Sequence, residues 1–97
     1  MKVRYLTVAN IEIVEAAEYY EIQKAGLGVE FLDELKRTEG RIVEHPKSWP
    51  RNLSKTHSCM IKRFPYSVIY YVAADEILIA AIHHHRRDPG RWEDRVS

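Results

Sequence analysis

The chain has 97 residues, of which 45% are hydrophobic and 30% are charged, a composition typical of a single small globular domain, residues 1–97. Its longest apolar runs, Val68–Ala74 and Ile77–Ile82, are the length of strands, which excludes a membrane-spanning helix. The acidic, amphipathic N-terminus excludes a signal peptide and the single Cys59 excludes an internal disulfide, so we expect a cytoplasmic protein.

The net charge of +1 conceals an uneven distribution along the chain. Residues 1–50 contain 7 lysines and arginines against 9 acidic residues, whereas residues 51–97 contain 8 against 5. Between Arg51 and Ala74 there are four basic residues and no acidic one. A basic half on a nearly neutral protein favours an anionic partner on one face, although solvated surface charge would give the same pattern.

The first half of the chain predicts a strand followed by two helices. Lys2–Val8 alternates as a strand does. Asn10 is a suitable N-cap for a helix with an apolar stripe, which ends at the Gly26–Gly28 linker. A second helix is expected from about Val29 to His45, with Pro46 stopping it, so the pair forms an antiparallel hairpin. The stripes consist of Ile13, Ala16, Ala17 and Tyr20 in the first helix and Phe31, Leu32, Leu35 and Ile42 in the second.

The second half predicts three strands, because the apolar period changes to two beyond the Pro46–Asn52 loop. The expected strands are Leu53–Phe64, Tyr66–Ala73 and Ile77–His84, and Ala74–Glu76 is a tight hairpin connection. Sequential strands with short links form an antiparallel meander. The element order therefore predicts an α+β fold with the helical hairpin packed on one face of the sheet.

Arginines and histidines gather at the ends of two predicted strands. Lys62 and Arg63 precede the turn into the middle strand, and His83–Arg87, with the sequence HHHRR, ends the last one. In a meander, Arg63 and this cluster could lie near one another. Arginine binds phosphate oxygens through a planar fork and histidine transfers protons near neutral pH, so the combination suits RNA cleavage by 2′-hydroxyl attack. Ion pairs between the arginines and helix carboxylates are the equally weighted structural alternative.

The other chemically notable residues favour structural roles. On a strand, His83 and His85 face one way and His84 the other, so at most two share a site, and no cysteine or carboxylate completes a zinc set. We therefore expect no metal and no other cofactor. The strand tyrosines and Cys59 are expected to pack in the core, and the glutamates of the first helix to face solvent. Trp92 is expected to cap an open edge of the core rather than to anchor a partner.

Two segments resemble the RelE/ParE toxin superfamily. The first is Arg63–Tyr70, with the sequence RFPYSVIY. The second is Ile79–Trp92, which ends in His-x-Arg-Arg-x-Pro-x-x-Trp, and in this register the His of the family falls on His84. Both are typical of the ParE-like, plasmid-stabilisation branch. The Tyr19–Tyr20 pair and the Phe-Leu-x-x-Leu pattern of the second helix agree, so the resemblance spans nearly the whole chain and implies the RelE-like fold.

The resemblance implies the toxin of a bacterial type II toxin–antitoxin system, blocked by a cognate antitoxin, with a heterotetramer as one assembly. ParE-like members poison DNA gyrase and are not nucleases, whereas RelE-like members cleave mRNA on the ribosome with basic residues and a C-terminal Tyr or His. This sequence has Trp92 in place of a C-terminal Tyr, and only Lys55 and Lys62 as candidate ribonuclease lysines. A gyrase poison is therefore the leading expectation, ahead of a ribonuclease and of an interaction module without toxicity.

The alternatives assign different roles to the same residues. In a ribonuclease, Arg63, His84 and Arg86 would be catalytic: His84 or His85 would transfer the proton, and Arg63, Arg86 and Arg87 would hold the scissile phosphate. His84→Ala or Arg86→Ala would then reduce activity by several orders of magnitude. In a gyrase poison, His84→Ala would be tolerated. Contacts to the target or to nucleic acid would come from Lys62, His85, Arg87, Arg91 and Trp92.

Overall fold

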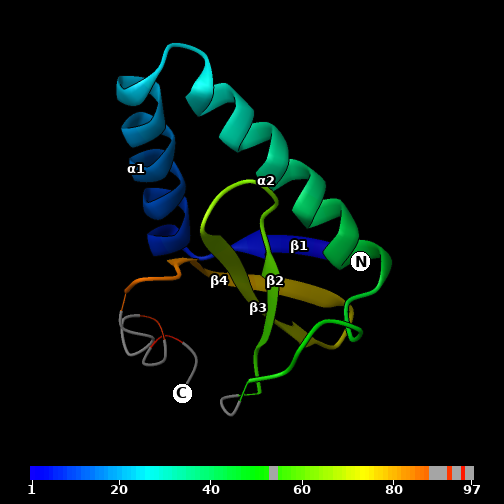
Figure 1. Cartoon of the computed structure of the whole chain (residues 1–97). Coiled ribbons are helices and arrows are strands. Elements are labelled where there is room, and N and C mark those ends of the chain that lie inside the picture. The colour runs from blue at the N-terminus through cyan, green and yellow to red at the C-terminus, as the bar shows by residue number, and fades with distance from the viewer. Residues whose placement is uncertain (53–54, 88–91, 93–94, 96–97) are drawn as a thin grey trace.

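A computed structural model of the protein describes residues 1–52, 55–87, 92 and 95. Two helices follow the first strand and precede three further strands, which confirms the predicted α+β order (Figure 1). None of the described helices is long and apolar enough to cross a membrane. The elements are β1 (Lys2–Tyr5), α1 (Thr7–Gln23), α2 (Leu27–Glu44), β2 (His57–Met60), β3 (Tyr66–Ala73) and β4 (Glu76–His84).

The strands form one mixed sheet in the order β1-β4-β3-β2. The antiparallel pairing of β2 with β3 and of β3 with β4 confirms the predicted meander. β1 joins it parallel to β4, from Lys2 opposite Glu76 to Tyr5 opposite Ile79. A parallel neighbour needs a long crossover connection, and the helical hairpin begins that connection. β2 is left as an edge strand.

The core lies between the sheet and the helical hairpin, which covers one face of it (Figure 1). α1 packs on β4 and α2 approaches β2. At the centre, the ring of Phe31 lies 5.2 Å from Phe64 and 5.4 Å from Tyr66, between ring centroids. Burying a side chain such as Phe31 stabilises the fold by roughly 1.5–3 kcal/mol. The helical stripes predicted from the sequence all pack here except Leu32, which is 42% exposed.

The boundary between β1 and α1 differs from the prediction. The sequence predicts a strand to Val8 and an N-cap at Asn10, whereas α1 begins at Thr7 with Leu6 as its N-cap. The Leu6 N–H donates to the Ile79 carbonyl at 2.9 Å, which completes the pairing with β4. The Leu6 carbonyl accepts the Asn10 N–H at 3.1 Å, so the helical hydrogen bonds start there. Sheet pairing, rather than a polar cap, therefore sets the start of α1.

The glycine linker starts α2 rather than ending α1. Gly26 has a φ of 90° and is the N-cap of α2, which begins at Leu27 instead of near Val29. The Glu21 carboxylate accepts the N–H groups of Gly26 at 2.9 Å and Gly28 at 3.1 Å. A carboxylate suits this position because the first N–H groups of a helix lack partners and carry partial positive charge. A side chain of α1 therefore supplies the cap that the linker lacks.

The second strand is much shorter than the predicted Leu53–Phe64. Of the described residues in that range, only His57–Met60 form a strand. The side-chain amide of Asn52 donates to the hydroxyls of Thr56 and Ser58, both at 2.9 Å, at the start of this strand. Arg63 has a φ of 72°, a left-handed conformation that turns the chain into β3. The alternation of apolar residues in the sequence therefore predicted too long a strand. It continues through the residues before His57 and through the turn at Arg63, neither of which is part of the strand.

Candidate functional site

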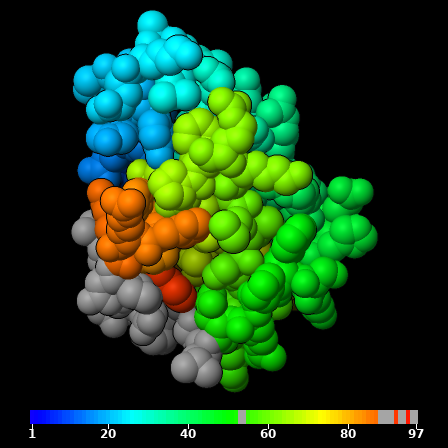
Figure 2. All heavy atoms as spheres, in the orientation of Figure 1, coloured from blue at the N-terminus to red at the C-terminus, as the bar shows by residue number. Residues whose placement is uncertain are grey.

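The 83–87 cluster lies where β4 ends and borders an open cleft against α1. We call it the terminal cleft, with Glu12, Glu15, Tyr66, His84, Arg86 and Arg87 among its lining residues and a volume of about 700 Å³. Figure 2 shows the end of β4 and the turn after it (orange) at the surface beside α1 (blue). The cleft brings together cations, a histidine and carboxylates, so its net character is mixed.

The three histidines divide between the two faces of the sheet. The His84 ring packs edge-on against Tyr66, with 4.9 Å between centroids, on the face that the helices cover. His85 places its Nε2 2.8 Å from the Ser67 hydroxyl, and the His83 ring lies 6.3 Å from Trp92. The alternation predicted from the sequence is confirmed. Among the described residues, no three histidine, cysteine or acidic side chains group in a way that could hold a metal ion.

Arg63 is directed toward α2 rather than toward the histidines. Its guanidinium lies 2.7 Å from a Glu30 carboxylate oxygen and 3.8 Å from one of Glu34. The hydrogen bond from Arg63 lowers the pKa of Glu30. The bond to Glu30 likewise raises the pKa of Arg63. Glu30 therefore accepts a hydrogen bond from the fork of donors that a phosphate would need, and Glu34 lies nearby.

The remaining predicted site residues differ in exposure. Trp92 is only 5% exposed and packs with Ile69 and Ala81 on the face of the sheet away from the helices. Arg91 lies outside the described residues. The exposed members are Lys62, His85, Arg86 and Arg87.

Sequence reasoning missed an ion pair made by Glu12, one of the residues that line the terminal cleft. The expected solvent-facing position of Glu12 is wrong, because its carboxylate pairs with both terminal nitrogens of Arg95 at 2.9 and 3.0 Å. Glu12 also accepts the Ile82 N–H at 3.0 Å. Arg95 in turn donates to the Ala80 carbonyl at 3.1 Å. α1, β4 and the C-terminal segment are thus joined by one carboxylate, which no local pattern signals.

The histidines at the end of β4 resist protonation. Burial, followed by the nearby histidines and Arg87, lowers the pKa of His83 below its usual 6.5. Burial, followed by Arg87 and Arg86, lowers the pKa of His84 in the same way. The lowered pKa values favour the neutral imidazoles, which add no positive charge to bind an anion.

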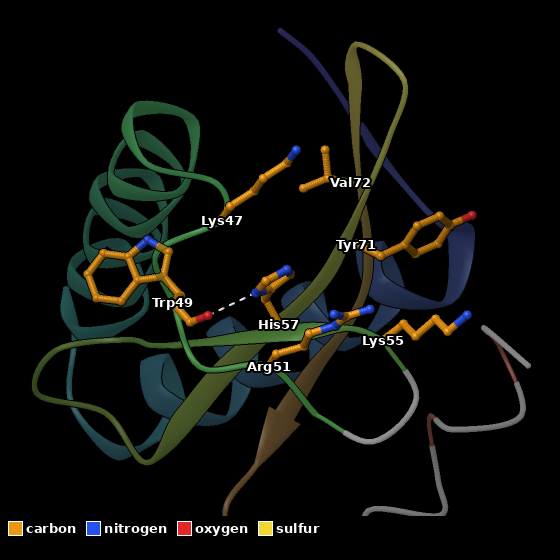
Figure 3. A pocket seen from close by; sticks show the side chains of 7 residues that line it. All are labelled: Lys47, Trp49, Arg51, Lys55, His57, Tyr71 and Val72. Carbon is orange, nitrogen blue, oxygen red and sulfur yellow. Dashed lines mark hydrogen bonds between the residues drawn. The ribbon is translucent and has the colours of Figure 1, made fainter.

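A second open cleft lies at the other end of the molecule's sheet, beside the edge strand β2. We call it the edge cleft, and no residue lines both clefts. Of the cations in this cleft, only Lys55 was a candidate from the sequence. The signal that could have indicated the cleft is the spacing of Lys47, Arg51 and Lys55 at intervals of four residues. Figure 3 shows its lining residues, which are Lys47, Trp49, Arg51, Lys55, His57, Tyr71 and Val72.

Comparison with known proteins identifies the family. Residues 3–89 match the family described as "ParE toxin of type II toxin-antitoxin system, parDE". No curated protein matches the chain. Among solved structures, the chromosomal ParDE TA system from P. aeruginosa has a similar chain, with a TM-score of 0.74 over 87% of this chain and 95% of that chain. At 13% identity this similarity shows the fold alone. Because the family match covers most of the sequence, this chain belongs to the ParE toxin family of type II toxin–antitoxin systems.

Proposed function

We propose that this protein inhibits growth by binding and poisoning DNA gyrase, not by cleaving RNA, and that a cognate antitoxin holds it inactive. The observation that carries the first part is the pairing of Arg63 with Glu30 and Glu34 on α2. A ribonuclease needs a proton acceptor and cations around one phosphate. The guanidinium of Arg63 is instead neutralised by carboxylates on a different element from His84.

The terminal cleft also disfavours a phosphodiester substrate. Glu12 and Glu15 line it together with His84, Arg86 and Arg87. A phosphate seated at His84 would lie near Glu15, and repulsion between like charges would weaken both binding and transition-state stabilisation. A protein surface with complementary charges of both signs suits such a cleft better. This mixed character supports a protein target over an RNA substrate.

The outer faces of the helices support a protein partner such as the antitoxin. Ile11, Val14 and Ile22 share one face of α1 and are 52%, 54% and 83% exposed. On α2, Val29 and Leu32 are 60% and 42% exposed. Aliphatic side chains aligned along helices and left in solvent mark surfaces that other proteins cover. An antitoxin seated on these helices would bury them without occupying the edge cleft.

The proposed function is tested by producing this protein in bacteria without an antitoxin. Incorporation of labelled thymidine and of labelled amino acids is followed over the first minutes. We expect DNA synthesis to stop first, with double-strand breaks, and we expect His84→Ala and Arg86→Ala to retain growth inhibition within a few-fold. Adding the protein to purified gyrase should increase the amount of cleaved DNA. Gyrase variants selected in cells that survive production of the protein should show no such increase.

A different outcome would replace the proposal. If protein synthesis stops first, mRNA is cut, and His84→Ala reduces growth inhibition by several orders of magnitude, the protein is a ribonuclease. Glu30→Gln with Glu34→Gln distinguishes the two further, since freeing Arg63 should leave a gyrase poison unchanged.

A further inference from the structure

We propose that the edge cleft binds a single strand of nucleic acid, with cations along the phosphates and an aromatic face against a base. This inference concerns a surface away from the terminal cleft, and it stands whether or not gyrase is the target. The cleft has a volume of about 640 Å³, the size of sites that enclose a small ligand. It is therefore a hollow that can receive a base, not a flat charged surface.

The charge of the edge cleft is positive and uncompensated. Lys47, Arg51 and Lys55 line it, and no acidic side chain does. Ion pairs among the described residues involve none of these three cations. The sequence contains no acidic residue between Glu44 and Asp75, so the segment that supplies most of the lining residues carries no negative side chain. Unpaired cations in a concave site concentrate positive potential and attract a polyanion.

Hydrogen bonds join residues 46–52, which carry Lys47 and Arg51, to the rest of the fold. The Trp49 indole N–H donates to the Arg41 carbonyl at 3.4 Å, and the Tyr70 hydroxyl donates to the Pro46 carbonyl at 2.6 Å. Asn52 ties the other end of the segment through its two side-chain hydrogen bonds. Because these contacts anchor the backbone that carries Lys47 and Arg51, these two cations lose less conformational entropy on binding than cations on an unanchored loop.

Lys55 adopts a backbone conformation that a lysine rarely takes. Its φ is 66°, in the left-handed region that favours glycine and asparagine. Such a conformation costs a non-glycine residue roughly 1 kcal/mol or more. The backbone conformation at this position disfavours lysine, so its presence there favours a binding role for its ammonium group in the cleft.

Rings within the cleft provide the second half of the site. His57 stacks on Tyr70 with 5.3 Å between centroids, and its Nδ1 lies 2.8 Å from the Trp49 carbonyl oxygen, to which it donates. The other ring nitrogen points away from that carbonyl and into the cleft (Figure 3). The half-buried Tyr71 extends from β3 beside Arg51 and Lys55 (Figure 3). Aromatic faces next to cations are the recurring elements of single-strand binding sites.

An acidic polypeptide is the competing ligand, and the geometry favours nucleic acid over it. An acidic peptide would use the cations but would leave the hollow and the Tyr71 ring without a role. A nucleotide uses all three, because its phosphate pairs with a cation while its base enters the hollow and stacks. Paired bases in a duplex are already stacked on each other, so the site selects an unpaired strand.

The test is fluorescence anisotropy of labelled single-stranded DNA and RNA of one sequence, titrated with the purified full chain at several salt concentrations. We expect binding to either strand with a linear dependence of log K on log salt. Arg51→Ala with Lys55→Gly should raise Kd by about tenfold or more and flatten the salt slope by about 0.7 per lost phosphate contact. Tyr71→Leu should raise Kd about fivefold or more without changing the slope, because it removes stacking and no charge.

Matched variants separate binding from folding and from general charge. Lys55→Gly relieves the left-handed strain, so its thermal midpoint should equal or exceed that of the unmodified protein while binding weakens. Lys36→Ala removes an exposed cation of α2 outside the cleft and should leave Kd unchanged. Weaker binding by Lys55→Gly at an equal or higher thermal midpoint can then not be assigned to unfolding, and the same midpoint measurement is made on Arg51→Ala and Tyr71→Leu.

Four results would overturn the proposal. They are the absence of salt-dependent binding, equal weakening by Lys36→Ala, tighter binding of duplex DNA than of either single strand, and displacement of the strand by a polyglutamate peptide at equal charge. The last result would assign the cleft to an acidic protein segment instead.

Discussion

Some side chains join elements that are far apart in the sequence, and Glu12 is the clearest case. Its carboxylate binds Arg95 and the Ile82 N–H, and the side chains of Glu12 and Arg95 are only 12% and 16% exposed. Removing one partner of such a pair leaves the other charged, poorly solvated and unpaired.

Glu12→Gln should therefore lower the free energy of unfolding by about 3 kcal/mol, measured by urea denaturation. The matched control is Glu18→Gln on the exposed face of the same helix, which should change it by less than about 0.5 kcal/mol. Equal effects of the two substitutions would mean that the ion pair contributes nothing beyond helix charge.

At the scale of elements, the close approach of α1 and α2 depends on Gly28. A Cβ at this position would lie 2.6 Å from the Ala17 carbonyl oxygen, so an alanine would force the helices apart. Gly40, in the same helix, has no atom within 4 Å of its would-be Cβ. One helix thus contains a glycine that packing requires and one that it does not.

Gly28→Ala should destabilise the protein by about 1–3 kcal/mol, because overpacking shifts backbone. Gly40→Ala should stabilise it by about 1 kcal/mol, because alanine has the higher helix propensity. Thermal unfolding of the two variants checks the pair, and a shift of both midpoints in the same direction would contradict the packing argument.

At the scale of the whole molecule, stability should depend on pH through the histidines at the end of β4. The folded pKa values of His83 and His84 are lowered from 6.5, so the unfolded chain binds protons more readily than the folded one. Their stabilising contribution is complete above pH 6.5 and is lost as the pH falls through the lower, folded values.

The free energy of unfolding should accordingly decrease on acidification below pH 6.5, and His83→Gln with His84→Gln should flatten that decrease. Denaturation at a series of pH values measures the slope, and NMR titration of the imidazoles measures the pKa values directly. Imidazole pKa values at or above 6.5 would contradict the burial argument.

Local pattern in the sequence determined the order of the elements, the apolar faces of the helices and the alternation of the three histidines. The strand Tyr66–Ala73 was predicted to the residue, because an apolar, strand-forming run between two turn signals depends on neighbours in the sequence alone. The family resemblance rested on short segments of the same kind and was confirmed.

Only the tertiary structure decided which residues meet. β1 beside β4, Arg63 beside Glu30, and Glu12 beside Arg95 join positions far apart in the chain, the last by 83 residues. The periodicity of a segment indicates which side of a helix or strand is apolar. It does not indicate which residue of another element will contact that side. The edge cleft likewise depends on two hydrogen bonds of its lining segment. Trp49 donates to the Arg41 carbonyl of α2, and Asn52 donates to the Thr56 hydroxyl. The fold could therefore be predicted from the sequence, because hydrophobic burial leaves a local pattern of apolar residues. The sites could not, because they depend on polar contacts between distant residues that form only when the chain has folded.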